Sequence, residues 1–581
     1  MQPSAFIIEG MPSRPRFPFA LSVSLLVLLA VTLLPGIAQA QAYAGRPKLI
    51  VIVVIDQFRA DYLNRDETLF KGRGFRLFMD EGAWFTDCYY DYANTKTAPG
   101  HATIGTGAYT DGHGIESNEF WDASRSMTHQ VTSVEDERYE LVDLSDSSIP
   151  ANQPSAPATA LKYVLGSSPR NLRATTLGDE LRLATQGRAH VYGISLKDRA
   201  AILPAGQSAN GAFWIDPSSG QFTTSTYYME HLPEWARAFN AGDRRADAER
   251  EARVPGTKQF FAQVGRTPAA NRYELDFAKA LIKGERLGQN GVTDLLVVSL
   301  SANDIQGHQF GPDSDSEQQM ILSLDRDLGS FFGWLDQNIG LKNVWLALTA
   351  DHGIAPIPGE AAKLGIDAAV VDTKRLYAAL NAELSARFSY GKPAEYLLPG
   401  PDLPYIVLNS QAFRAAGVDE TTAENAVAEM LPEAIAHLSP HPGENSDAGP
   451  ALHRLPPTPQ VVGVYTRLEF ERGQLPPSEW GRLLAHSYAD HGNWFVMLVL
   501  GAYQMGGSSP FGGTTHFSPW SYDRHVPLAF YGEPFASGEY HQKVAPVDLA
   551  VTFSSLLGIN RPSAAVGHVL TMALKPLSSG K

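Results

Sequence analysis

A threonine, Thr97, stands just before a segment with the signals of a helix start. Pro99 and Gly100 follow it, and the run His101–Ile104 is compatible with a helix. Proline is well suited to a first helical position. We therefore expect the Thr97 hydroxyl at a helix N-terminus, where unpaired backbone N–H groups and the helix dipole stabilise a phosphate or an alkoxide. The alternative is a structural helix cap, an ordinary role for threonine.

Three continuous apolar runs, rich in β-branched residues, each lead into an aspartate. The runs and their aspartates are Leu49–Ile55 with Asp56, Leu295–Leu300 with Asp304, and Val344–Leu348 with Asp351. Such runs are typical of parallel strands that are buried on both faces. Because the carboxyl ends of parallel strands form the ligand crevice of an open α/β sheet, the three carboxylates are expected to converge.

Histidines accompany two of these aspartates. His308 follows Asp304 after three residues, and His352 follows Asp351 directly. Carboxylate and imidazole ligands without sulfur suit a catalytic zinc site, which keeps a position open for water or substrate. A single Asp-His pair is more often structural, but that explanation would have to hold independently at three strand ends. A second Ala-Asp-His-Gly segment, residues 489–492, follows no buried strand and is left outside the predicted site.

Two metal ions about 4 Å apart can stabilise the attacking and leaving oxygens of a phosphoryl transfer. In addition to such ions, two residues with cationic side chains follow another expected strand. Lys197 and Arg199 stand two residues apart at the end of the expected strand 190–196. This spacing predicts both side chains on one face and Asp198 on the other. Together they could bind the non-bridging oxygens of a dianionic phosphate, and a pair of surface charges is the alternative.

Bulk composition restricts the class of protein. The 581 residues are enough for one large α/β domain with insertions or for two domains. With 47 Lys plus Arg against 62 Asp plus Glu, the formal net charge is −15, so we expect no nucleic-acid binding. The single cysteine, Cys88, excludes an internal disulfide and a cysteine-based metal cluster. Its aromatic neighbours indicate a small, buried, apolar role.

The N-terminal segment has the pattern of a cleaved signal peptide. Arg14 and Arg16 precede an apolar run from residue 17 to residue 34, and Ala38-Gln-Ala40 has the small-x-small form of a cleavage site. We therefore expect removal of residues 1–40, a periplasmic or secreted protein, and no stable membrane span after cleavage. An uncleaved anchor is the alternative, because the apolar run nearly reaches the length of a membrane span.

Further patterns predict the elements that position these residues. The expected additional strands lie at residues 83–88, 190–196, 212–215, 221–225, 404–408, 461–465, 494–500 and 527–531. The expected helices lie at residues 75–80, 176–184, 274–283, 321–335, 423–438 and 547–557. Residues 151–160 and 440–457 are expected to be loops. Residues 359–506 are expected to form an inserted α+β subdomain within a catalytic domain of residues 47–358 and 507–575.

Seven separated motifs resemble, in order, those of the alkaline phosphatase superfamily, and most closely its secreted phosphomonoesterases with a threonine nucleophile. The motifs are Asp56, Thr97-x-Pro-Gly-His101, His113-Gly-Ile-x-x-Asn118, Lys197-Asp-Arg199, Asp304-x-x-x-His308, Asp351-His352-Gly and Thr515-His516. The resemblance extends from about residue 48 to the C-terminal region. It implies an α/β fold, a three-layer α/β/α sandwich with a mostly parallel central sheet.

The resemblance also implies a site with two zinc ions per chain. The first ion would be bound by Asp304, His308 and His516, and the second by Asp56, Asp351, His352 and the Thr97 oxygen. The residues implied to contact phosphate oxygens are Asn118, Lys197 and Arg199. Supporting or structural roles are expected for His101, His113 and His525. Phe517 stands where the family commonly has glycine, which leaves the ligand His516 intact but affects the expected backbone shape beside it.

The implied activity is hydrolysis of small phosphate monoesters by double displacement, with activity rising toward alkaline pH. Thr97 would attack phosphorus, and water would then hydrolyse the phosphothreonine. A phosphodiesterase or nucleotide pyrophosphatase of the same superfamily is the nearest alternative, but Lys197 and Arg199 favour a doubly charged monoester. A sulfatase is disfavoured because Thr97 stands in no Cys-x-Pro-x-Arg pattern. A phosphate-binding protein without activity is the alternative from a different class.

Overall fold

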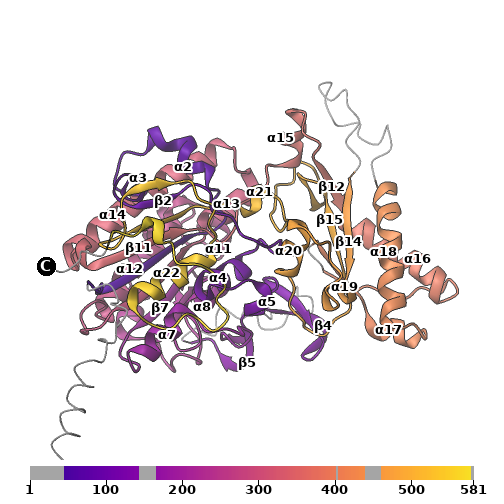
Figure 1. Cartoon of the computed structure of the whole chain (residues 1–581), viewed down its shortest axis with the longest axis horizontal. Coiled ribbons are helices and arrows are strands. Elements are labelled where there is room, and N and C mark those ends of the chain that lie inside the picture. The colour runs from indigo at the N-terminus through magenta and orange to yellow at the C-terminus, as the bar shows by residue number, and fades with distance from the viewer. Residues whose placement is uncertain (1–44, 143–164, 401–402, 439–458, 577–581) are drawn as a thin grey trace, which may run out of the picture.

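The computed structural model describes residues 45–142, 165–400, 403–438 and 459–576. The expected signal peptide and the two expected loops, 151–160 and 440–457, lie outside these residues. Figure 1 shows a large body that contains both the first and the last described segments, with a smaller part beside it. Among the described residues, no helix has the length and hydrophobicity of a membrane span.

A nine-stranded sheet forms the centre of the large body, in the order β18-β2-β17-β11-β1-β10-β7-β8-β9. Its strands are β18 (Gly538–Tyr540), β2 (Ala83–Phe85), β17 (Leu528–Tyr531), β11 (Val344–Thr349), β1 (Leu49–Ile55), β10 (Asp294–Leu300), β7 (Val191–Ser195), β8 (Gly211–Ile215) and β9 (Phe222–Thr223). The adjacent strands β11, β1, β10, β7 and β8 are all parallel. The sheet is therefore mostly parallel, as the apolar runs predicted.

The central strand β1 determines where the three neighbouring strands end relative to one another. All seven of its residues are buried, and it pairs with β10 on one side and β11 on the other. Ile55 lies opposite Leu300, and Val54 lies opposite Thr349. The three strands therefore end at one edge of the sheet, which is the crevice that open α/β sheets use for ligands.

Helices cover both faces of the sheet (Figure 1). One group comprises α4 (Thr97–Thr106), α7 (Leu177–Ala184), α8 (Asp198–Ala205) and α22 (Val547–Leu557), which contact one another. The other comprises α3 (Phe75–Glu81), α12 (Pro268–Gly284), α13 (Ala302–Phe310) and α14 (Asp315–Asn338). This arrangement confirms the predicted three-layer α/β/α fold.

The residues between β12 (Ala369–Asp372) and β16 (Gln504–Gly507) in the sequence form a smaller part with its own hydrophobic core. Its antiparallel sheet has the order β13-β15-β14; α18 packs against that sheet, and α16 packs against α18. These elements are β13 (Tyr405–Val407), β15 (Phe495–Leu500), β14 (Val461–Thr466), α16 (Thr373–Phe388) and α18 (Glu420–His437). We propose that residues 359–506 are an inserted subdomain.

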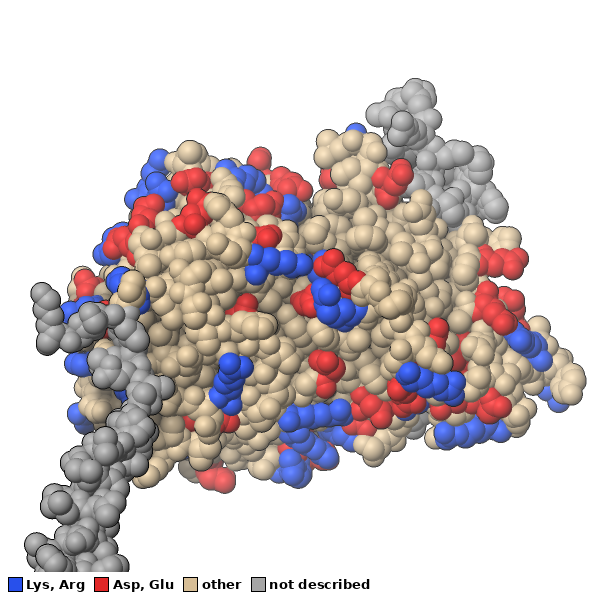
Figure 2. Space-filling model, viewed as in Figure 1, with Lys and Arg blue, Asp and Glu red and all other residues tan. Residues whose placement is uncertain are grey.

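Besides the short 3-10 helices Glu67–Leu69, Leu341–Asn343 and Thr571–Ala573, shorter elements complete the described chain. They are α2 (Asp61–Asp66), α5 (Thr110–His113), β3 (Glu119–Asp122), β4 (Ser126–Thr132), β5 (Glu135–Glu140), β6 (Leu165–Ser167), α9 (Glu234–Ala241), α10 (Arg244–Glu251), α11 (Phe260–Gln263), α15 (Pro358–Lys363), α17 (Ser410–Ala415), α19 (Arg467–Glu471), α20 (Glu479–Ala485) and α21 (Ser521–Arg524). Acidic and basic side chains are interspersed over the described surface in Figure 2, without one continuous basic field on the face shown.

The structure extends two of the predicted helices and shortens one predicted strand. The helix expected at 274–283 begins earlier, because Pro268 occupies its first turn and Thr267 precedes it. The helix expected at 321–335 also starts earlier, where the Ser314 side chain accepts a hydrogen bond from the Glu317 N–H. The strand expected at 83–88 ends at Phe85, and Cys88 is a buried free thiol, as predicted.

Candidate active site

The three strand-end aspartates lie together at one edge of the sheet. Asp56 directly follows β1, and Asp351 follows β11 after one intervening residue. Asp304 lies in the first turn of α13, which begins two residues after β10. All three carboxylates are buried. The level ends of three paired parallel strands bring these distant residues to one place.

The first candidate metal-binding group consists of Asp304, His308 and His516. His308 lies one helical turn after Asp304, with its Nε2 3.1 Å from Asp304 Oδ1. His516 reaches the same oxygen from the segment after β16, at 3.8 Å. Ligand atoms about 2 Å from a tetrahedral zinc ion lie roughly 3.3 Å apart. The three side chains therefore have the spacing of ligands to one such ion.

The second candidate group consists of Asp56, Asp304 and His352, so Asp304 belongs to both. His352 Nε2 lies 3.5 Å from Asp56 Oδ1 and 3.5 Å from Asp351 Oδ2. Within the described part of the chain, Asp56 Oδ1, Asp351 Oδ2 and His352 Nε2 are buried without a hydrogen-bond partner. Buried polar atoms left unsatisfied are costly, and a cation among them would satisfy all three.

Backbone contacts orient all three histidines in the same way. The Nδ1 atoms of His308, His352 and His516 lie 2.8, 2.8 and 2.6 Å from backbone carbonyl oxygens. A carbonyl oxygen can only accept, so each Nδ1 must donate, and each Nε2 then carries the lone pair that a metal ion requires. Metal-binding histidines are commonly held in this way. The residues present therefore fit a pair of divalent cations.

The electrostatics of the cluster agree with this fit. Burial, followed by the neighbouring Asp304 and Asp351 carboxylates, raises the pKa of Asp56 well above its usual value. Burial, followed by the adjacent His352 and His308 rings, lowers the pKa of His516 well below its usual value. A neutral imidazole is the form that binds metal. Crowded carboxylates without a cation take up protons, and a bound divalent cation would reverse that tendency.

Helix α4 begins at Thr97, so the threonine occupies the first helical position and Pro99 lies within the first turn. The helix comes into direct contact with the turn that carries Asp351. A Cβ atom on Gly100 would lie 2.2 Å from the Asp351 carbonyl oxygen, so only glycine permits this approach. Asn118 Oδ1 accepts a hydrogen bond from the Ala98 N–H at 2.8 Å. Thr97 and Asn118 are thus neighbours at a helix N-terminus.

Lys197 and Arg199 lie in different surroundings. Lys197 is the N-cap residue of α8, and its Nζ lies 2.6 Å from Asp56 Oδ2 and 2.5 Å from Asp304 Oδ2. Arg199 lies in the first helical turn and lines a pocket that Asn118 also lines. Because the helix begins at Asp198, the alternation of side chains along a strand does not govern these residues. Among the described residues, Arg199 Nε has no hydrogen-bond partner.

Gln57 is a residue of the candidate site that sequence analysis missed. Its backbone N–H donates to Asp351 Oδ1 at 3.0 Å, and its side-chain Nε2 donates to Asp304 Oδ1 at 2.7 Å. It has a φ of 65°, a left-handed conformation that is uncommon outside glycine. Its place directly after a strand-end aspartate was the available signal. Gln57 therefore orients two of the three carboxylates.

Three further histidines with predicted supporting or structural roles lie outside the two candidate metal-binding groups. His101 is buried, with Nε2 2.7 Å from Ser299 Oγ, Nδ1 2.8 Å from the Thr97 carbonyl oxygen and Nδ1 3.3 Å from Asp351 Oδ2, so it lies between α4 and Asp351. His113 Nδ1 accepts a hydrogen bond from the Ile115 N–H, and His525 stacks on Tyr89.

The segment that repeats Ala-Asp-His-Gly lies apart from both groups. Its His491 stacks on Phe120, with ring centroids 4.1 Å apart. Its Nε2 lies 3.8 Å from Glu116 Oε2. The repeat therefore contributes to the packing between the subdomain and the segment after α5.

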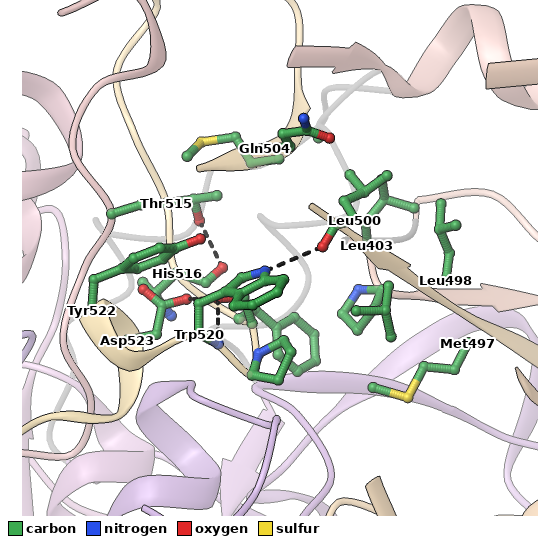
Figure 3. Close-up of a pocket in the computed structure, with 18 residues that line it drawn as sticks. Leu403, Met497, Leu498, Leu500, Gln504, Thr515, His516, Trp520, Tyr522 and Asp523 are labelled. Carbon is green, nitrogen blue, oxygen red and sulfur yellow. Dashed lines mark hydrogen bonds between the residues drawn. The ribbon is translucent and has the colours of Figure 1, made fainter. Parts of the chain in front are cut away.

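His516 lies where the large body meets the subdomain. Figure 3 shows it with Thr515, Trp520, Tyr522 and Asp523 on one side of a small pocket, opposite Leu498 and Leu500 of β15. Trp520 Nε1 donates to the Leu500 carbonyl oxygen at 3.1 Å, a bond drawn as a dashed line. The segment that supplies His516 is therefore anchored to the subdomain.

The carboxyl edge of this mostly parallel sheet carries buried carboxylates and histidines that could hold metal ions, an arrangement that suits a phosphoesterase. Residues 50–469 match the model of the type I phosphodiesterase / nucleotide pyrophosphatase family, and the chain belongs to that family. The resemblance to alkaline phosphatases inferred from the seven motifs is confirmed by individual relatives that are named as such.

Two curated relatives and one crystal structure are similar over nearly the whole chain. The alkaline phosphatase PafA of Elizabethkingia meningoseptica is 32% identical over 94% of this chain and 98% of that protein. The alkaline phosphatase PhoV of Synechococcus elongatus is 32% identical over 91% of this chain and 94% of that protein. The crystal structure of wild-type PafA has a TM-score of 0.76 and 29% identity, covering 91% of this chain and 99% of that one.

Proposed function

We propose that this protein is a metal-dependent alkaline phosphatase that hydrolyses phosphate monoesters through a phosphothreonine at Thr97. The observation that carries the proposal is the convergence of Asp56 Oδ1, Asp351 Oδ2 and His352 Nε2 at the sheet edge that α4 contacts. The names of the relatives support the activity. A purified protein that retains less than one zinc ion per chain after dialysis, and releases no phosphate from a panel of monoesters, would contradict it.

Two zinc ions would be held by the residues already described. The proposed ligand sets are Asp304, His308 and His516 for one ion, and Asp56, Asp351, His352 and the Thr97 oxygen for the other. When bound, such a pair would favour the Thr97 alkoxide and stabilise the oxygen of the departing alcohol. The histidine orientation and the buried carboxylates are the support for these sets, and zinc is favoured by the mixture of imidazole and carboxylate ligands.

The protein residues carry the reaction in two displacements. The Thr97 oxygen forms a bond to phosphorus while the bond from phosphorus to the alcohol oxygen breaks. Water then attacks the phosphothreonine, which releases phosphate and restores the threonine. The N-terminus of α4 would stabilise the negative charge of a bound phosphate, and Asn118 and Arg199 line the pocket beside it. We propose that they bind the phosphate oxygens, with Lys197 neutralising charge on the carboxylate side.

The preference for monoesters over diesters tests the proposed roles of the Lys197 and Arg199 side chains. In the double variant Lys197→Ala with Arg199→Ala, kcat/KM for a monoester is expected to fall on the order of 10²-fold or more, and by less for a diester with one negative charge. Steady-state kinetics with both substrate types measures this difference. The family name makes diester hydrolysis the second candidate function.

A double variant on α16 is the matched control for this comparison. Lys374→Ala with Arg375→Ala removes one exposed lysine and one exposed arginine from the subdomain. Both kcat/KM values should stay at the wild-type level in that protein. A loss confined to diester turnover in the Lys197 and Arg199 variant would identify the protein as a diesterase instead.

Gln57→Asn is expected to weaken metal binding about 10- to 100-fold. Asparagine tolerates the left-handed backbone but is one methylene too short to reach Asp304 from the same position. The metal dissociation constant, measured by competition with a chelator, reports the change. Gln186→Asn is the control, because Gln186 is an exposed glutamine with a similar φ of 54°. Equal affinities in the two variants would show that Gln57 does not position the ligand.

We also propose that residues 1–40 are a signal peptide and that the mature protein is periplasmic or secreted. The support is the apolar run and the Ala38-Gln-Ala40 motif. N-terminal sequencing of protein from the expressing cells should find Gln41 first. An intact apolar segment in membrane fractions would favour the anchor instead.

A further inference from the structure

Phe517 has a backbone conformation that favours glycine. Its φ is 92°, in the left-handed region that residues with a bulky side chain rarely adopt. Such strain persists only where the surroundings determine the conformation, and it gathers at functional sites. Phe517 directly follows the proposed ligand His516, so the phenylalanine side chain is present at this position despite an unfavourable backbone.

Thr95 holds the strained segment from two residues before Thr97. The Thr95 Oγ1 accepts hydrogen bonds from the Phe517 N–H at 3.1 Å and from the Ser518 N–H at 2.9 Å. The Thr95 carbonyl oxygen accepts from His516 Nδ1. The backbone of residues 516–518 is thereby fixed to the stretch that carries the threonine nucleophile, and the direction of the Phe517 side chain is fixed with it.

The Phe517 ring is held by its neighbours. The side chain is buried, with a relative exposure of 6%. Lys96 Nζ lies 4.3 Å from the ring centroid, a cation–π contact. The Tyr405 ring, from β13 of the subdomain, lies 5.9 Å away between centroids. Tyr405 is itself anchored, because its hydroxyl donates to Asn94 Oδ1 at 3.1 Å.

These rings form part of a pocket of about 310 Å³. Its lining includes Asn118 and Arg199, the proposed phosphate-binding residues, and the aromatic side chains of Trp121, Tyr405 and Phe517. A phosphate held by Asn118 and Arg199 would therefore have its alcohol portion within reach of these aromatic rings. Flat rings pack favourably between aromatic side chains.

We propose that Phe517 is a specificity-determining residue, and that this pocket receives the alcohol portion of phosphate monoesters whose alcohol carries a flat aromatic ring. The inference rests on the proposed phosphatase function. Phe517 supplies one wall from the large body, and Tyr405 supplies another from the subdomain. The positive φ gives a direct test, since glycine can replace phenylalanine here without backbone strain.

The test compares benzyl phosphate with ethyl phosphate. Both release a primary alcohol, so the chemical step is closely matched and the aromatic ring is the main difference. The ratio of kcat/KM for benzyl over ethyl phosphate is expected to fall roughly tenfold in Phe517→Gly, because one aromatic contact is lost. Phe517→Leu should lower the ratio in the same direction and keeps an apolar side chain in place. Phe517→Tyr should keep the ratio.

Tyr390→Gly is the matched control. Tyr390 is also an aromatic residue with positive φ, 53°, but it is fully exposed on the subdomain. Its substitution should leave the ratio unchanged. Equal ratios in wild type, Phe517→Gly and Phe517→Leu would overturn the inference while the phosphatase function stands. Absence of turnover of both esters by the wild-type protein would instead refute the proposed function, and the inference with it.

Discussion

Thr97→Ala is expected to lower kcat/KM for phosphate monoesters on the order of 10³-fold or more, because the variant has no oxygen to form the phosphothreonine. The loss should appear mainly in kcat, since the remaining phosphate-binding groups stay in place. Steady-state kinetics with a chromogenic monoester measures it. Brief acid quenching with a ³²P-labelled substrate should also find labelled protein in the wild type and none in this variant.

Two substitutions serve as controls for Thr97→Ala. Thr97→Ser keeps a hydroxyl and should retain much of the activity and the acid-stable label. Thr106→Ala removes another buried hydroxyl from the same helix, one that donates to the Ala102 carbonyl oxygen at 2.7 Å. That protein should turn over substrate like the wild type. Activity in Thr97→Ala above a tenth of the wild-type value would exclude a nucleophilic threonine.

Asp304→Asn is expected to have the second large effect, a loss of bound metal together with a loss of activity on the order of 10³-fold. Asp304 is a proposed ligand of one ion, but it belongs to both groups of side chains that could hold a metal, so its charge would also stabilise the second ion. His516 belongs to one group only. His516→Ala should therefore retain about one zinc ion per chain, whereas Asp304→Asn should retain fewer. Elemental analysis after dialysis gives both numbers.

The repeated Ala-Asp-His-Gly segment supplies the control for the metal experiment. Asp490→Asn makes the same chemical change in the same local sequence, at a residue outside both candidate groups. Its zinc content and kcat/KM should equal those of the wild type. Equal zinc content in Asp304→Asn and Asp490→Asn would contradict the proposed ligand sets.

Much of the central sheet could be predicted because its strands are buried on both faces. In β1, β10 and β11 nearly every residue is apolar, and a run of this kind has few other interpretations. Helix ends were less predictable. The start of α12 depends on a proline at its first position, and that of α14 depends on one serine side chain, both of which are local signals outside the apolar pattern.

The candidate site was predictable where residues lie at strand ends. Asp56 and Asp351 follow their strands closely, and the register of the sheet then places them together. The contacts of Gln57, Thr95 and Lys197 could not be predicted. Each depends on which side chain from a distant segment faces it, and the sequence pattern carries no information on such pairings. The same holds for Tyr405, which reaches the pocket from the subdomain.

The hydrogen bond between Tyr405 and Asn94 connects the smaller part of the molecule to the large body. It ties the proposed insertion to the loop that leads into Thr97, while the proposed reacting groups all lie on the large body. Under the proposed function, mutations in the insertion are therefore expected to change which alcohols are accepted and to leave bond cleavage intact. We expect exchange of this insertion between family members to change the selectivity for the alcohol without rebuilding the catalytic centre.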